Sequence, residues 1–145
     1  EVRAKALGAL KLAEYTSLVF AANGTAVNAG NPNHSGLIGS QQGVRGLPDS
    51  LYRNRAQVYA NLELRQALSL GKRWYVQGVL FTDAASFEPM NAGGRATSWI
   101  GAWSTGAGIR ILPTALVDTL LRFDVARLHY PFGAWFVQFG INQYI

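Results

Sequence analysis

The sequence predicts an all-β fold, an antiparallel transmembrane β-barrel, and three observations support that prediction. First, apolar and polar residues alternate with a period of two along several segments, as in strands with one polar and one apolar face. Second, several of these segments exceed the roughly five or six residues usual for strands of globular proteins. Third, their apolar faces end in Trp74, Trp99 and Trp135, where the aromatic belt of an outer-membrane barrel would lie.

Seven strands are expected from this alternation, in segments separated by turn-forming residues. They span residues 2–12, 17–27, 53–65, 74–83, 99–111, 116–128 and 135–145. Short connections fall near 13–16, 69–73, 112–115 and 129–132, and longer ones span 28–52 and 84–97. Short turns at one end and long loops at the other are typical of outer-membrane barrels.

Segment 53–65 shows the two faces most clearly. One face is polar and reads Arg53, Arg55, Gln57, Tyr59, Asn61, Glu63 and Arg65. The other face is apolar apart from Asn54. In segment 74–83 the same alternation places Asp83 on the polar face. We infer that the polar faces line a water-filled lumen and that the apolar faces contact lipid.

Two architectural alternatives remain open. A soluble β-sandwich with one wet face would produce a similar alternation. Within the barrel interpretation, seven strands do not match the even strand number of bacterial single-chain barrels, and open sheet edges in lipid are costly. Either one strand is missing from the count, within 30–43, or the chain is the end of a larger barrel.

Composition narrows the possible functions. The net charge is +5, but basic residues occur singly apart from Lys72-Arg73, so we expect no nucleic-acid partner. No apolar run reaches the roughly 18 residues that a transmembrane helix needs. Cys is absent, and His34 and His129 are the only histidines, so neither a metal site nor another cofactor is expected.

Five short motifs resemble the BamA/TamA-like surface-antigen superfamily of bacterial outer-membrane proteins. They are VRGL at 44–47, NLELR at 61–65, FTDAA at 81–85, GAGIRI at 106–111 and LRFDVA at 121–126. Each motif alone is weak, but their order and spacing agree with the family from about residue 40 to the end of the chain. The resemblance implies that residues 1–145 are the C-terminal portion of an outer-membrane barrel, about seven strands of roughly sixteen.

The resemblance also implies a site. In this family the VRG loop, here about 28–52, folds back into the barrel lumen, and its arginine meets acidic residues on the inner wall. Carried over, Arg45 pairs with Glu63 and Asp83.

The remaining motif residues have supporting parts in this interpretation. Val44, Gly46 and Leu47 complete the loop motif, and Phe81, Arg65 and Asp124 belong to the supporting strand motifs. Two positions depart from the family: Leu47 replaces an aromatic residue, and Ala85 replaces a glycine.

Other interpretations of these residues compete with that one. Arg45 could be a solvated turn arginine. Glu63 and Asp83 could form a catalytic acid pair, but no nucleophile or positioned histidine accompanies them, so we do not expect an enzyme.

The function implied by the resemblance is insertion or translocation of polypeptides at the bacterial outer membrane, without a cofactor. Its partners would be outer-membrane lipid, a polypeptide substrate and other subunits of an assembly machinery, and periplasmic domains would precede this region. Two alternatives stay open. The barrel could anchor a fused patatin-like lipase, which an upstream Gly-x-Ser-x-Gly would reveal, or it could be a small passive pore or adhesin.

Overall fold

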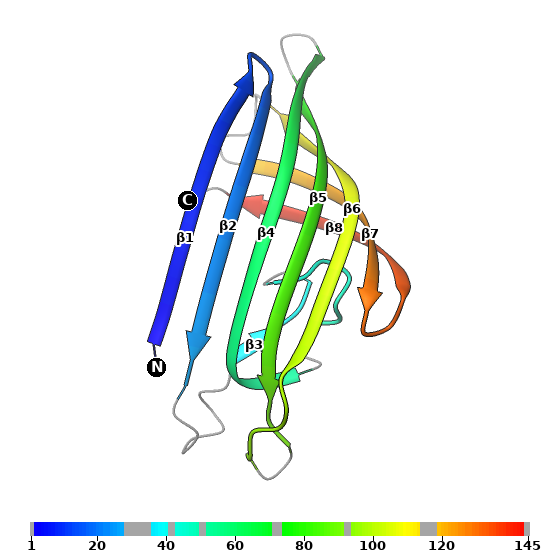
Figure 1. Ribbon diagram of the computed structural model, residues 1–145. Coiled ribbons are helices and arrows are strands. Elements are labelled where there is room, and N and C mark those ends of the chain that lie inside the picture. Colours follow the sequence, from blue (N-terminus) through cyan, green and yellow to red (C-terminus); the bar gives the residue numbers. More distant parts are fainter. Residues whose placement is uncertain are drawn as a thin grey trace.

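The computed structural model describes residues 2–27, 36–40, 43–49, 52–70, 74–91, 94–113 and 119–143. They form one antiparallel sheet of eight strands (Figure 1), which confirms the predicted all-β antiparallel class and adds one strand to the seven expected. The strands are β1 (Val2–Ala13), β2 (Thr16–Ala26), β3 (Gly36–Ile38), β4 (Tyr52–Leu70), β5 (Trp74–Pro89), β6 (Ile100–Pro113), β7 (Thr119–Tyr130) and β8 (Ala134–Gln143). Among the described residues, no helix is long and apolar enough to cross a membrane.

The sheet order is β1-β2-β4-β5-β6-β7-β8, and β3 lies beside β4, off this path. Direct cross-strand neighbours share a face of an antiparallel sheet. The pairs Glu63↔Phe81 and Phe81↔Gly106 therefore place these residues of β4, β5 and β6 on one face. We call this the inner face, because residues 36–40 and 43–49 pack against it, and we call the opposite side the outer face.

The sheet curves around residues 36–40 and 43–49 (Figure 1). Leu47 of this segment packs against Phe87 on β5 and Leu128 on β7. Ser40 donates a hydrogen bond to Gln138 on β8, with 2.5 Å between Oγ and Oε1. A single short segment thus reaches strands from the middle and from the end of the sheet, which requires the sheet to wrap around it.

An apolar cluster fastens the segment to the inner face. Its buried members are Ile38, Val44, Leu47, Phe87, Ala102 and Leu128. Leu47, where the resemblance leads one to expect an aromatic residue, is fully buried. The wall supplies the rings instead, with Phe87 in the cluster and Tyr52, Tyr59 and Phe136 packed at its edge.

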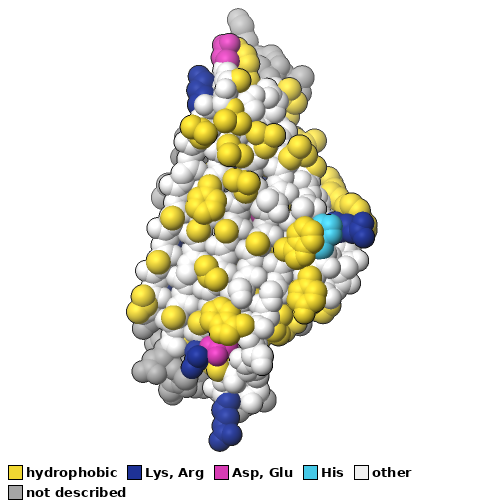
Figure 2. Space-filling view, in the orientation of Figure 1, with side chains coloured by type: hydrophobic (Ala, Val, Ile, Leu, Met, Phe, Trp, Pro, Cys, Tyr) yellow, Lys and Arg dark blue, Asp and Glu magenta, His cyan; other side chains and the backbone are white. Residues whose placement is uncertain are grey.

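The outer face carries many large apolar side chains exposed to the surroundings. Leu80 at mid-strand is 59% exposed, and Val137 and Phe139 on β8 are 68% and 65% exposed. In Figure 2, apolar side chains spread over the middle of this face, and charged side chains gather toward its margins. The faces predicted for the middle and end of the sheet are confirmed at these positions.

One strand lies where a loop was predicted, within the stretch 30–43 that could hold a missing strand, and two predicted strands are longer than expected. The short β3 lies inside the segment predicted as a loop at 28–52 and pairs with the start of β4, from Gly36↔Asn54 to Ile38↔Tyr52. Three residues are too few to show a period of two. β4 and β5 extend beyond the predicted ends at 65 and 83, so the predicted loop 84–97 is shorter than expected. The small residues at 84–86 conceal that continuation, because they do not alternate in polarity.

The eighth strand does not resolve the question of closure. In the described part of the chain, β1 and β8 each pair with one neighbour, β2 and β7 respectively. Residues 28–35, 41–42 and 50–51 of the predicted loop, residues 116–118 of the predicted sixth strand and residues 144–145 of the last one lie outside the described residues.

A bulge in β4 reverses part of the predicted facing. The register with β5 shifts between Asn54 and Ala56. Asn54 is 1% exposed, whereas Arg53 and Arg55 are exposed. The expectation that these two arginines share the face of Glu63 is wrong, because the extra residue of a bulge interrupts the alternation.

The connection after β7 is short, as predicted near 129–132, but it departs from the expected separation of short and long connections between the two ends of the sheet. Because successive long strands run in opposite directions, the connection after β7 lies at the same end as the long connections after β2 and β5. It is nevertheless short, and Gly133 adopts a φ of 64° there, a left-handed conformation that glycine tolerates in tight turns. The prediction of short turns at one end and long loops at the other therefore fails at 131–133.

Replacing Phe87 by Ala tests the apolar cluster. We expect the free energy of unfolding to fall by about 3–5 kcal/mol, because Phe87 is fully buried where the loop meets the sheet. Phe132→Ala is the matched control: it removes the same atoms from a half-exposed turn position and should change the free energy by about 0.5 kcal/mol or less. Urea unfolding measures both, and equal losses would contradict the packing described.

Candidate functional site

The site is built around Arg45, at the tip of the segment that the sheet surrounds. A turn holds the tip, with the Leu47 amide donating to the Val44 carbonyl at 3.1 Å. Gly43 and Gly46 flank the arginine with φ values of 143° and 88°, in the region that favours glycine. At Gly46 an added Cβ would also lie 3.0 Å from the ring of Phe136, so the backbone approaches the wall closely.

Arg45 binds two carboxylates on neighbouring strands. Its Nε and Nη2 donate to the two oxygens of Asp83 at 2.7 and 2.6 Å, a bidentate pair. Its Nη1 donates to Glu63 Oε1 at 2.6 Å, and its backbone amide donates to Asp83 Oδ2 at 3.1 Å. Asn61 donates to both the Gly43 carbonyl and Asp83, at 2.7 and 2.9 Å, and so links the loop to the same carboxylate.

Phe81 lies beneath the guanidinium group. The central carbon of the Arg45 guanidinium is 3.5 Å from the Phe81 ring centroid, a cation–π contact. The opposite strand makes room for the ring at Gly106, where an added Cβ would lie 2.4 Å from Phe81 and 2.2 Å from the Val125 carbonyl oxygen. The packing of the site therefore requires Gly106, the first glycine of the GAGIRI segment.

The charged network extends across the inner face. Arg65 donates to Glu63 through Nε at 2.8 Å. Asp124 on β7 accepts from Arg110 at 2.5 Å and also from Arg122, and it lies 4.0 Å from Arg45 Nη1. Three carboxylates, those of Glu63, Asp83 and Asp124, thus face four guanidinium groups.

Burial makes these contacts interdependent. Arg45 is 3% exposed, and Asp83 and Asp124 are fully buried. Burial lowers the pKa of Arg45, but hydrogen bonding and Coulomb attraction to Asp83, followed by Glu63, outweigh this and raise its pKa above the ordinary value. Arg45 therefore remains a cation at any physiological pH.

The structure brings together all the residues that the sequence assigned to the site. Arg45 pairs with Glu63 and Asp83, so the interpretation of Arg45 as a solvated turn arginine is wrong. Phe81, Arg65 and Asp124 lie in the same network, and Val44 and Leu47 anchor the loop.

Four participants were not singled out from sequence, namely Asn61, Ser104, Arg110 and Arg122. Ser104 is fully buried, and its hydroxyl lies 3.5 Å from Asp83. The period-two alternation places each of the four on the same face as an identified acid, which is the signal that could have revealed them.

The described residues offer few other reactive groups. They hold no cluster of three or more His, Cys, Asp or Glu side chains suited to a metal ion. His129 stacks on Trp103 with 4.0 Å between ring centroids, and its Nε2 lies 2.8 Å from the Thr105 hydroxyl. His34 lies outside the described residues.

Comparison with known protein families, curated proteins and solved structures finds no match for this chain.

A double-mutant cycle tests the central ion pair. Arg45→Ala should lower the free energy of unfolding by about 3–5 kcal/mol, because it leaves the buried Asp83 without its cation. Adding Asp83→Asn should recover part of that loss, giving a coupling energy of about 1–3 kcal/mol.

The control cycle uses Arg55 and Glu88, whose Nε–Oε2 distance is also 2.6 Å but whose arginine is 44% exposed. That exposed pair should give a coupling energy of about 1 kcal/mol or less. Equal coupling in the two cycles, measured by urea unfolding, would show that burial does not strengthen the Arg45 pair.

Gly106→Ala should also be destabilising, because the new methyl group would overlap the backbone of β7 and the Phe81 ring. We expect a loss of about 1–3 kcal/mol, as for other overpacked cores. Gly78→Ala on β5, where no atom lies within 4 Å of the added Cβ, is the matched control and should be neutral or slightly stabilising. Similar effects of the two substitutions would contradict the role assigned to Gly106.

Proposed function

We propose that this chain is the C-terminal part of an outer-membrane β-barrel that takes part in inserting or translocating polypeptides. The observation that carries the proposal is an arginine on an inward-folded loop, bound to two carboxylates on the polar face of a curved antiparallel sheet. The three charged residues of this contact come from motifs that resemble the surface-antigen superfamily. VRGL contributes Arg45, NLELR contributes Glu63, and FTDAA contributes Asp83.

The outer face supports a membrane setting. Its large apolar side chains are exposed along β8, where Trp135, Val137, Phe139 and Ile141 are all more than 60% exposed. Such a continuous apolar surface is unusual on a soluble monomer, whereas lipid would cover it in a barrel. Trp74 at the start of β5 and Trp135 at the start of β8 lie at opposite ends of the sheet, as the two aromatic belts of a barrel do.

The contacts between the loop and the inner face support a functional role for the loop. A polypeptide-handling barrel must keep its lumen in a defined shape while substrate passes or inserts, and a loop bound only by exposed polar contacts would fluctuate. The bidentate pair with Asp83 and the bond to Glu63 restrict both the position and the orientation of the loop tip. In this mechanism Arg45 acts structurally and takes no part in covalent chemistry.

The membrane setting is tested by Leu80→Arg. Leu80 is 59% exposed on the outer face, so a soluble sheet should accept arginine there with little change in stability. If lipid covers this face near mid-membrane, the same change should cost about 2–4 kcal/mol and reduce the yield of folded protein in outer membranes. Arg95→Leu in the connection after β5 serves as the reverse control, and a fully stable, normally inserted Leu80→Arg protein would overturn the membrane proposal.

The functional role of the loop is tested by Arg45→Ala in the natural gene product. We expect secretion or barrel insertion to fall at least about tenfold, the loss equivalent to 1.4 kcal/mol, because the loop tip loses both carboxylate contacts. Leu47→Ala is the matched control: it weakens the packing of the same loop and keeps the ion pair. Normal activity of Arg45→Ala would overturn the proposal. If Arg45→Ala and Leu47→Ala prove equally stable, an equal loss of activity in both would also overturn it.

A further inference from the structure

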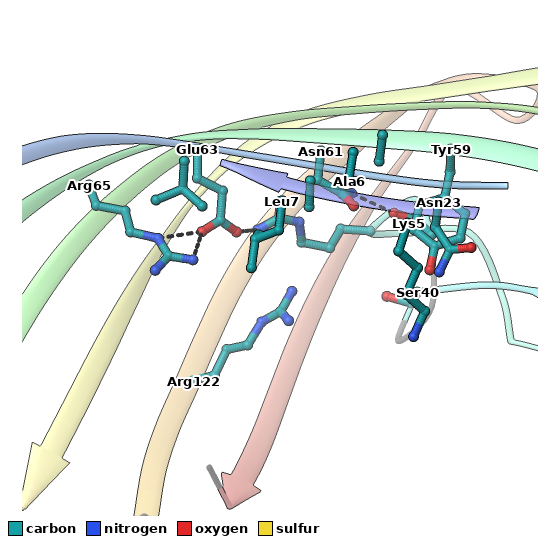
Figure 3. A pocket seen from close by; sticks show the side chains of 15 residues that line it. Lys5, Ala6, Leu7, Asn23, Ser40, Tyr59, Asn61, Glu63, Arg65 and Arg122 are labelled. Atoms are coloured by element: carbon teal, nitrogen blue, oxygen red, sulfur yellow. Dashed lines mark hydrogen bonds and ion pairs between the residues drawn. The ribbon is translucent and has the colours of Figure 1, made fainter. Parts of the chain in front are cut away.

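A hollow of about 400 Å³ opens on the inner face beside the loop. Its floor consists of small and apolar side chains of β1 and β2, among them Leu7, Val19 and Ala21. Because these side chains are short, the space between β2 and the Arg45 loop remains unfilled. Figure 3 shows polar side chains from β1, β2, β4 and the loop around the rim of this space, with Arg122 reaching it from β7.

The hollow carries an excess of positive charge. Among its lining residues, Lys5, Arg45, Arg65 and Arg122 are cationic and only Glu63 is anionic. Asp83 and Asp124 lie behind the lining and balance two of these charges, but both are fully buried and already bound by arginines. Arg122 shares Asp124 with Arg110, so the described network leaves Arg122 without a carboxylate of its own.

Two polar groups that line the hollow have no hydrogen-bond partner among the described residues. Within the described part of the chain, the Lys5 ammonium makes no hydrogen bond or ion pair. Asn23, its direct neighbour across β1 and β2, has a side-chain oxygen that is buried and lacks a partner. Tyr59 is paired with Asn23 on the other side and lines the same space. Buried polar atoms in native proteins are nearly always satisfied. Asn23 Oδ1 can only accept, so its partner must be a donor, either solvent or a protonated oxygen of a ligand.

We propose that this hollow binds an oxyanion, a phosphate or a carboxylate group, between Lys5 and Arg122. Charge-assisted hydrogen bonds from the ammonium and the guanidinium would neutralise the excess charge, as arginine and lysine do at other phosphate and carboxylate sites. A protonated phosphate oxygen would in addition donate to Asn23, which a carboxylate cannot do. This assignment goes beyond the proposed function, because it depends on the inner face alone and holds whether or not lipid covers the outer face.

The test is equilibrium dialysis of the purified natural gene product at low and high NaCl. Labelled inorganic phosphate is one probe, and a labelled acetyl-hexaglutamate amide is the other. Saturable phosphate binding that high salt weakens is expected. Tighter binding of the peptide would identify carboxylates of polypeptides as the source of the anion, and tighter binding of phosphate would identify a phosphate group.

The variants are Lys5→Gln and Arg122→Gln. Each should weaken binding of the preferred probe about tenfold, as expected when one partner of a charge-assisted hydrogen bond is lost. Arg95→Gln makes the same charge change on the exposed connection after β5 and should bind as the unmodified protein does.

Arg122 also contacts Asp124, so its variant is checked by urea unfolding, and the exposed Lys5 gives an independent result if Arg122→Gln fails to fold. Absence of saturable binding of either probe would overturn the proposal, as would equal binding by Lys5→Gln and Arg95→Gln. The Leu80→Arg experiment addresses the membrane setting separately, so failure of one proposal is distinguishable from failure of the other.

Discussion

The buried contact of Arg45 with Asp83 and Glu63 is the constraint on which the rest of this structure depends. A guanidinium that is 3% exposed must have its charge and its donors satisfied, and only residues from two adjacent strands supply both carboxylates. The loop must therefore enter the concave side of the sheet, and the glycines at 43 and 46 let its backbone approach the wall. Phe81 supports the guanidinium from below, and Gly106 leaves room for the ring.

The same constraint accounts for the concentration of charged and amide side chains on the inner face around the loop. The inner face needs carboxylates, amides and arginines to hold the loop, and it acquires a small apolar cluster only where Val44 and Leu47 meet Phe87 and Leu128. The outer face then carries most of the exposed large apolar side chains. The buried polar side chains therefore lie on the concave side of the sheet and the exposed large apolar ones mostly on the convex side, which is the reverse of an ordinary soluble sandwich.

Charge on the inner face is not evenly balanced. The three carboxylates lie close to Arg45 and form ion pairs with the arginines around them. Lys5 and Arg122, in contrast, border an open hollow. The pairing that fixes the loop therefore also creates a positively charged surface beside it. Structure and ligand chemistry are coupled here, because the residues that hold the loop in place also determine the electrostatic potential of the space that remains.

The sequence by itself determined the strand periodicity, the antiparallel all-β class, the facing of Glu63 and Asp83, and, through motif resemblance, the partners of Arg45. These follow from a period-two pattern and from local motifs. Only the tertiary structure decided the bulge between Asn54 and Ala56, the continuation of β5 to Pro89, the burial of Leu47, and the recruitment of Arg110 and Arg122. Those features depend on which strands lie opposite one another and on the space left between loop and wall, and neither quantity is encoded in the alternation along a single strand.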